Sequence, residues 1–127
     1  MPLKARELAR LIARAAAEKK AEDIIVLDIG KLLIITDYFV ICSGKTTRHV
    51  KTIFENIQRK LGEEAVRPLG VEGQSEAYWI LLDCGDVVAH IFTERERDYY
   101  QLERLWKDAP QLNWDESLKK KRPKSTT

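Results

Sequence analysis

Two strand-like runs separated by only two residues constrain the fold of this chain more than any other feature. Residues 78–83 and 86–93 are rich in aliphatic and β-branched side chains, and only Cys84 and Gly85 lie between them. Such a short connection between two strand-like runs is typical of an antiparallel β-hairpin. The sequence therefore predicts a tight hairpin at this point of the chain.

The pairing implied by such a turn sorts the hairpin residues onto two faces. With Cys84 and Gly85 as the turn, Asp83 pairs with Asp86 and Trp79 pairs with His90, and directly opposed residues share a face. One face is wholly apolar and is expected to lie against the core: Ile80, Leu82, Val87, Ala89 and Ile91. The other is mixed in character: Trp79, Leu81, Asp83, Asp86, Val88 and His90.

The mixed face indicates a protein-binding surface. A solvated sheet face is mostly polar, whereas a covered face does not hold carboxylates and an imidazole without partners. Apolar anchors in a polar rim are typical of interfaces, where Trp often dominates the binding energy. The predicted contacts are apolar burial by Trp79, Leu81 and Val88, pairing of Asp83 and Asp86 with basic side chains, and polar rim contacts by His90 or Tyr100.

Two alternatives remain open for these aromatic residues. Trp79 could instead pack beneath the C-terminal residues 112–114, which we expect to fold back onto the domain. Tyr100 is expected on the side of the third helix that carries Glu96 and Arg97, where a lone exposed tyrosine is also common by chance.

Helix-like and strand-like segments alternate along the rest of the chain. Apolar spacing predicts a first helix over residues 4–20 and a second that begins after Thr46 and stops at Gly62. A capping box at Thr93 and Glu96 precedes a third helix, which ends at Pro110. Its expected buried stripe is Tyr99, Leu102, Leu105, Trp106 and Ala109. Apolar runs over residues 23–29 and 37–42 predict strands buried on both faces. An irregular connection is expected over residues 31–36. Residues 67–71 suit a short edge strand, because they include a proline.

This order of elements predicts an α/β fold: a mixed β-sheet of about five strands with helices mainly on one face. We expect a single domain over residues 1–114 and a basic C-terminal tail with little order over residues 115–127. The tail contains four consecutive basic residues, 119–122, followed by Lys124. Such a run is either a solvated tail or a source of sequence-independent attraction to a phosphate-rich partner.

Composition argues against several classes of protein. No apolar run approaches the roughly 20 residues that span a bilayer, and no signal peptide is recognisable, so we expect a cytoplasmic protein without membrane contact. The formal net charge of +2 is low for a domain that binds nucleic acid mainly through phosphates. Cys42 and Cys84 are interpreted as reduced thiols, and the scattered Cys and His residues do not predict a metal site or a cofactor.

Enzyme motifs are incomplete. Residues 43–47 (SGKTT) match the end of a phosphate-binding loop, but Phe39 stands where its first glycine is required. A nucleotidyltransferase needs paired carboxylates after such a turn to hold magnesium, and Arg48 and His49 stand there instead. His90 has no nucleophile near it in the predicted pairing. We therefore expect no enzyme activity; the alternative is a nucleotide-binding or nucleotidyltransferase-like enzyme on the same fold.

Several segments together resemble the ribosomal silencing factor (Iojap-like) family. They are residues 37–41 (DYFVI) with Ser43 and Gly44, Glu72 and Gly73, residues 79–92 (WILLDCGDVVAHIF), and then Arg97, Tyr99, Tyr100, Leu102, Glu103, Leu105 and Trp106. The resemblance covers about residues 5–110 and excludes the basic tail. Because the segments are long and occur in a fixed order, they are far more specific than the partial phosphate loop.

The resemblance implies a fold and a function. The implied fold is a small mixed sheet with nucleotidyltransferase-like topology but without its catalytic residues. Members of the family bind ribosomal protein fourteen of the large subunit, block subunit joining and repress translation, and can assist large-subunit biogenesis. Several are homodimers when free. For this chain the resemblance implies the same partner and a homodimer when free. The basic tail lies outside the resemblance, and its charge favours a weak contact with ribosomal RNA.

Overall fold

The structure is a computed structural model that describes residues 3–30 and 36–115. Most of the irregular connection expected over residues 31–36, and all of the expected tail except Asp115, therefore lie outside the described residues. The helices are α1 (Ala5–Glu18), α2 (Thr47–Glu63), α3 (Glu94–Tyr100) and α4 (Leu102–Leu105). The strands are β1 (Glu22–Asp28), β2 (Tyr38–Gly44), β3 (Gly70–Glu72), β4 (Trp79–Asp83) and β5 (Val87–Thr93).

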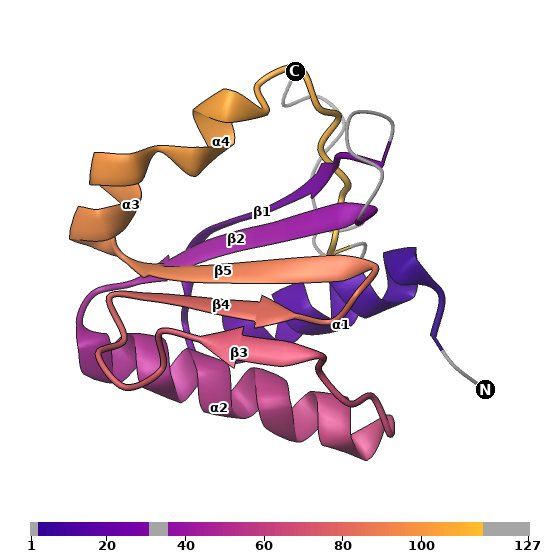
Figure 1. The fold of residues 1–127 in the computed structure, drawn as a ribbon, viewed down its shortest axis with the longest axis horizontal. Coiled ribbons are helices and arrows are strands. Elements are labelled where there is room, and N and C mark those ends of the chain that lie inside the picture. The colour runs from indigo at the N-terminus through magenta and orange to yellow at the C-terminus, as the bar shows by residue number, and fades with distance from the viewer. Residues whose placement is uncertain (1–2, 31–35, 116–127) are drawn as a thin grey trace, which may run out of the picture.

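The strands form one mixed sheet in the order β1-β2-β5-β4-β3 (Figure 1). β2 and β5 are parallel neighbours at its centre, and the other pairs are antiparallel. Helices α1 and α2 cover one face, here called the inner face, while α3 and α4 lie away from them (Figure 1). The predicted five-stranded mixed sheet, with its helices mainly on one face, is confirmed.

The two apolar runs near the N-terminus form strands in different positions: β2 lies inside the sheet and β1 lies at its edge. Every residue of β2 is buried, as predicted for a strand covered on both faces. β1 is an edge strand, and several of its residues remain partly exposed, so that prediction was wrong for this strand. Residues 110–112 pair with its free edge: Asp28 N–H donates to the Pro110 carbonyl at 2.8 Å and Leu112 N–H to the Val26 carbonyl at 2.8 Å. These bonds use backbone groups that an open edge would leave unpaired.

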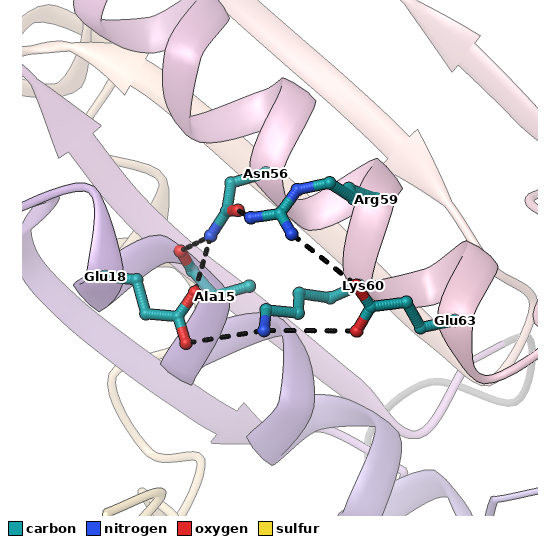
Figure 2. Close-up of polar contacts among 6 residues, drawn as sticks. All are labelled: Ala15, Glu18, Asn56, Arg59, Lys60 and Glu63. Atoms are coloured by element: carbon teal, nitrogen blue, oxygen red, sulfur yellow. Dashed lines mark hydrogen bonds and ion pairs between the residues drawn. The ribbon is translucent and has the colours of Figure 1, made fainter.

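A polar cluster joins α1 to α2 beside the core (Figure 2). Asn56 is 3% exposed, and its Nδ2 donates to the Ala15 carbonyl at 2.8 Å and to Glu18 Oε1 at 2.9 Å. Arg59 donates to Asn56 Oδ1, and Lys60 lies 3.7 Å from Glu18 Oε2. The hydrogen bond from Asn56, then the nearby Lys60, lower the pKa of Glu18. The buried amide is thus fully paired, which fixes how the two helices pack.

The helix ends differ from expectation in two places. Thr46 caps α2 as predicted, with Oγ1 accepting from His49 N–H at 3.1 Å. Gly62 does not end the helix, because α2 continues to Glu63 and Ala65 takes the left-handed conformation instead (φ 57°). Thr93 also caps its helix, but the expected single helix to Pro110 is broken at Gln101, which is left-handed with φ 48°.

The break at Gln101 changes which side chains of this region are buried. Leu102, Trp106 and Ala109 pack against the outer face of the sheet, as predicted for the apolar stripe. Tyr99 and Leu105 do not, being 77% and 74% exposed. A stripe drawn with continuous helical spacing no longer applies once one residue leaves the helical conformation. The prediction of burial was therefore wrong for these two residues.

Candidate protein-binding surface

The hairpin forms, but its register is shifted by two residues from the predicted one. Trp79 pairs with Phe92, Leu81 with His90, and Asp83 with Val88. The Cys84 N–H donates to the Val87 carbonyl at 2.9 Å, so Gly85 and Asp86 are the central turn residues. Gly85 has a φ of 86°, a conformation that glycine adopts without strain. Because side chains alternate with a period of two, this shift keeps every strand residue on its predicted face.

Cross-strand pairing places the mixed face of the hairpin on the outer face of the sheet. One row of neighbours runs from Glu72 through Leu81 and His90 to Ile41, and the next runs from Gly70 through Asp83 and Val88 to Phe39. Leu102, Trp106 and Ala109 cover the part of this face near β1 and β2. The part over β4 and the adjoining end of β5 keeps partly exposed side chains, here called the hairpin patch: Trp79, Leu81, Asp83 and Val88.

Trp79 lies at one end of the hairpin patch, among other aromatic rings. Its ring centroid is 4.8 Å from that of Phe92, in a stacked arrangement, and 4.9 Å from that of Tyr100. Leu112 and Trp114 do fold back onto the domain, but they pack in the inner cluster, beneath the other face of the sheet. Trp79 therefore does not lie under them, and its side chain remains partly exposed.

His90 holds the indole in place from beneath. Trp79 Nε1 donates to His90 Nδ1 at 3.1 Å, so the neutral imidazole carries its own proton on Nε2. His90 is 4% exposed, and burial lowers its pKa to about 4. Its Nε2 has no hydrogen-bond partner among the described residues, and its ring makes an edge contact with Phe39 at a centroid distance of 4.7 Å. His90 is thus a buried support for Trp79, and of the two residues predicted for a polar rim contact, His90 and Tyr100, only Tyr100 is exposed.

The remaining predicted site residues lie around Trp79 and along the hairpin patch. Asp83 Oδ1 accepts from Gly85 N–H at 2.8 Å, so this carboxylate shapes the turn. Asp86 lies exposed in the same turn, off the strand face, and its carbonyl accepts from Asp37 N–H at 2.9 Å. Tyr100 is 48% exposed and reaches over Trp79 from α3. The structure therefore brings Tyr100 together with the hairpin patch and leaves Asp86 at its far end.

Sequence reasoning missed two residues of this face. Phe92 is fully buried under Trp79, and the two-residue error in register concealed the pairing between them. Glu72 is exposed on β3 directly beside Leu81, which adds a carboxylate to the polar rim. The edge-strand pattern near Pro68 indicated a third strand, but nothing in the sequence specified its register against β4.

The turn between β2 and α2 does not form an open phosphate-binding loop. The Lys45 N–H donates to His49 Nδ1 at 3.0 Å, and His49 Nε2 bonds the Lys19 carbonyl at 2.7 Å. A Cβ at Gly44 would lie 3.0 Å from the His49 ring, so a larger residue there would require the ring to shift. The His49 imidazole therefore already accepts a hydrogen bond from a backbone N–H of the turn, a group that a phosphate-binding loop would direct at an anion.

A second feature of this end of the sheet is a buried arginine. Arg97, expected on the exposed side of its helix, is only 8% exposed. Its Nε lies 3.2 Å from Glu103 Oε2, and its Nη1 donates to the Glu22 carbonyl at 3.3 Å and to Ser43 Oγ at 3.4 Å. These contacts hold α3 and α4 against the ends of β1 and β2, and the expectation of exposure was wrong.

The cysteines have the character of structural thiols. Both are free; burial raises the pKa of Cys42 to about 12, and burial together with Asp83 raises that of Cys84 to about 11. At neutral pH both are therefore protonated and unreactive. Across residues 3–30 and 36–115, no three His, Cys, Asp or Glu side chains gather as a metal site would require. No helix in the same ranges has the length and apolar character to cross a bilayer.

Comparison with known proteins identifies relatives over most of the chain. The family model described as ribosomal silencing factor during starvation matches residues 2–127. This match is longer than the resemblance expected over residues 5–110, and it includes the basic segment 119–124. A ribosomal silencing factor from Bacillus subtilis is 40% identical over 110 residues, covering 87% of this chain and 93% of the relative. A crystal structure of a Chromobacterium violaceum protein superposes with a TM-score of 0.80 at 36% identity, covering 83% of this chain and 88% of that one.

One relative of mammalian origin carries a name that bears on the large subunit. The mouse protein called mitochondrial assembly of ribosomal large subunit protein 1 is 32% identical over 92 residues. The match covers 70% of this chain and 40% of the mouse protein. The shared region is therefore the domain described above rather than the whole of the longer relative.

Proposed function

Because this chain belongs to the ribosomal silencing factor family, we propose that it binds ribosomal protein fourteen of the large ribosomal subunit. Bound there, it blocks the approach of the small subunit and so represses translation. The name of the mouse relative also supports a role in large-subunit biogenesis.

The observation that carries this proposal is the hairpin patch. Trp79 is held by His90 from beneath and by stacking on Phe92, so little conformational entropy is lost when a partner covers it. Leu81 and Val88 add apolar area beside it, and Glu72 and Asp83 supply an acidic rim. A rigid aromatic anchor within a polar rim is the arrangement that dominates the energy of many protein interfaces.

The proposed mechanism is steric and requires no reaction. A domain seated on one ribosomal protein excludes the small subunit from the same volume. The degree of silencing should therefore follow the fraction of large subunits that carry the domain. The proposal also includes homodimerisation of the free protein and a contact of the basic segment 119–124 with ribosomal RNA.

Co-sedimentation with purified large subunits tests the proposal directly. Trp79→Ala should weaken binding by about 30-fold, which corresponds to about 2 kcal/mol for a hot-spot residue. Leu105→Ala is the matched control, because Leu105 is a large apolar side chain, 74% exposed, that lies on α4 outside the hairpin patch. Retention of Trp79→Ala at the wild-type level would remove the hairpin patch as the binding surface.

Subunit joining and the basic segment need separate measurements. Adding small subunits to preloaded large subunits should yield fewer whole ribosomes with wild-type protein than with Trp79→Ala. Deleting residues 119–127 should reduce affinity mainly at low salt, because contacts with phosphates weaken steeply as salt rises. A deletion that abolishes binding at every salt concentration would show that the hairpin patch is not the main contact.

A further inference from the structure

A small pocket opens beside Trp79, between the loop that follows β3 and helix α3. Its volume is about 220 Å³, and it is lined by Gly73, Glu76, Tyr78, Trp79, Glu96 and Tyr100. Three segments of the chain contribute to it: the loop 73–78, the first residue of β4, and α3. The volume suits one side chain rather than a drug-sized ligand, whose sites usually measure about 300–1,000 Å³.

The backbone fixes the shape of this pocket, hereafter the aromatic pocket. Gly73 has a φ of 83°, and a Cβ there would lie 2.1 Å from the Trp79 carbonyl oxygen. The Ala77 N–H donates to the Gly73 carbonyl at 2.8 Å and closes the loop, while the Thr93 N–H donates to the Tyr78 carbonyl at 2.9 Å. Only glycine permits this approach of the loop to β4. Glycine is therefore required at position 73, because it lets the loop and β4, which form two walls of the pocket, approach each other.

The chemistry of the lining is aromatic and acidic. Tyr78 and Tyr100 are 54% and 48% exposed, and Trp79 lies next to Tyr100. Glu76 comes from the loop and Glu96 from α3, and none of the lining residues is basic. Among the residues that the structure describes, neither of these two carboxylates forms an ion pair or a side-chain hydrogen bond.

We infer that the aromatic pocket receives an arginine or lysine side chain of the protein that docks on the hairpin patch. A cation over a Trp or Tyr face is attracted by the ring quadrupole, and the carboxylates of Glu76 and Glu96 add direct charge pairing. An anionic group would meet two carboxylates, and an apolar side chain would remove water from them without replacement. The inference rests on the proposed docking surface and specifies the chemistry that the partner must present beside it.

Neutral, nearly isosteric substitutions test the role of charge. The double variant Glu76→Gln/Glu96→Gln should bind purified large subunits about 10-fold more weakly than wild type, with a shallower dependence on salt. The matched control is Glu55→Gln/Glu64→Gln, which makes the same change in net charge at exposed positions on and just after α2. If the control loses as much affinity as the double variant, long-range attraction accounts for the effect and the pocket does not.

Substitutions at Tyr78 test the aromatic wall separately. Tyr78→Leu should weaken binding several-fold, whereas Tyr78→Phe, which keeps the ring, should bind as wild type. Circular dichroism and thermal melting of each variant confirm that the fold is kept. Equal affinity of the Leu and Phe variants would overturn the cation–ring contact.

Trp79→Ala, measured in the same series, separates failure of this inference from failure of the proposed function. Loss of binding by Trp79→Ala with wild-type binding of Glu76→Gln/Glu96→Gln would refute the pocket and leave the docking surface standing. Wild-type binding by Trp79→Ala would refute the docking surface itself, and the inference with it.

Discussion

Protonation of His90 in the unfolded chain should make the stability of the folded protein fall between pH 7 and pH 5. The folded protein holds the imidazole neutral, because burial lowers its pKa from 6.5 to about 4. The neighbouring rings, Phe39, Trp79 and Phe92, carry no charge near neutral pH that could offset this. In the unfolded chain the same group has its ordinary pKa and binds a proton as the pH falls below 6.5.

The magnitude follows from the difference between these two pKa values. Stability rises with pH wherever the unfolded chain binds more protons, so the contribution of a neutral His90 is complete above pH 6.5 and is lost toward pH 4. Each pH unit across this interval corresponds to about 1.4 kcal/mol, which gives a total of about 3 kcal/mol, of which about 2 kcal/mol is lost between pH 7 and pH 5. Such a loss is a large part of the stability of a domain of this size.

Urea unfolding at pH 7 and pH 5, followed by circular dichroism, measures this loss. The control is His90→Asn, whose Oδ1 can accept the hydrogen bond from Trp79 Nε1 but whose side chain does not titrate. Asn leaves a buried amide incompletely paired, which lowers stability equally at both pH values. Carboxylates elsewhere titrate in both proteins, so the difference between the two pH-dependent losses isolates His90.

Wild type should lose about 2 kcal/mol more than His90→Asn on going from pH 7 to pH 5. The indole N–H of Trp79 should also keep a downfield proton resonance in His90→Asn and lose it in His90→Leu, which offers no acceptor. Parallel pH dependences of wild type and His90→Asn would refute the assignment of a buried, neutral imidazole.

Three further substitutions probe the contacts that position the surface. Gly73→Ala should lower the free energy of unfolding by about 2 kcal/mol or more, because it combines a positive φ with a Cβ 2.1 Å from a carbonyl oxygen. Thermal melting measures this loss, and an unchanged melting temperature would contradict the prediction. Asn56→Ala should cost about 2 kcal/mol in urea unfolding, since the Ala15 carbonyl and Glu18 lose their donor, whereas Gln58→Ala on the exposed face of α2 should cost less than about 0.5 kcal/mol. Arg97→Met should lower the free energy of unfolding by about 2 kcal/mol, which is less than the loss expected on breaking a fully buried ion pair, because the Glu103 side chain is 34% exposed. The same variant should show faster hydrogen exchange in α3. A stability equal to that of wild type would argue against an anchoring role for Arg97.

Local signals in the sequence predicted much of the fold correctly. The period-two pattern of the hairpin assigned its faces, and this assignment survived the two-residue error in register because an even shift leaves side chains on the same side. Thr46 and Thr93 were recognised as helix caps because the capping hydrogen bond spans only three residues. The failures came where one residue changes conformation, as at Gln101, which exposed Tyr99 and Leu105.

The candidate site was predictable in composition but not in geometry. The mixed face of the hairpin pointed to Trp79 and Leu81, since their alternation with core residues is visible in the sequence. The burial of His90, however, depends on Phe39 from β2 and on Phe92. The aromatic pocket depends on a loop and a helix that are separated by the whole hairpin. No local pattern specifies such contacts.

The sequence by itself determined the strand faces, the helix caps and, through its long ordered segments, the family, because each of these is written in residues close together in the chain. Tertiary structure alone decided which part of the outer face stays uncovered, which imidazole supports the tryptophan, and where two carboxylates and three aromatic rings enclose a pocket. These features depend on how segments that are distant in the chain pack together, and the pattern of neighbouring residues does not specify that packing.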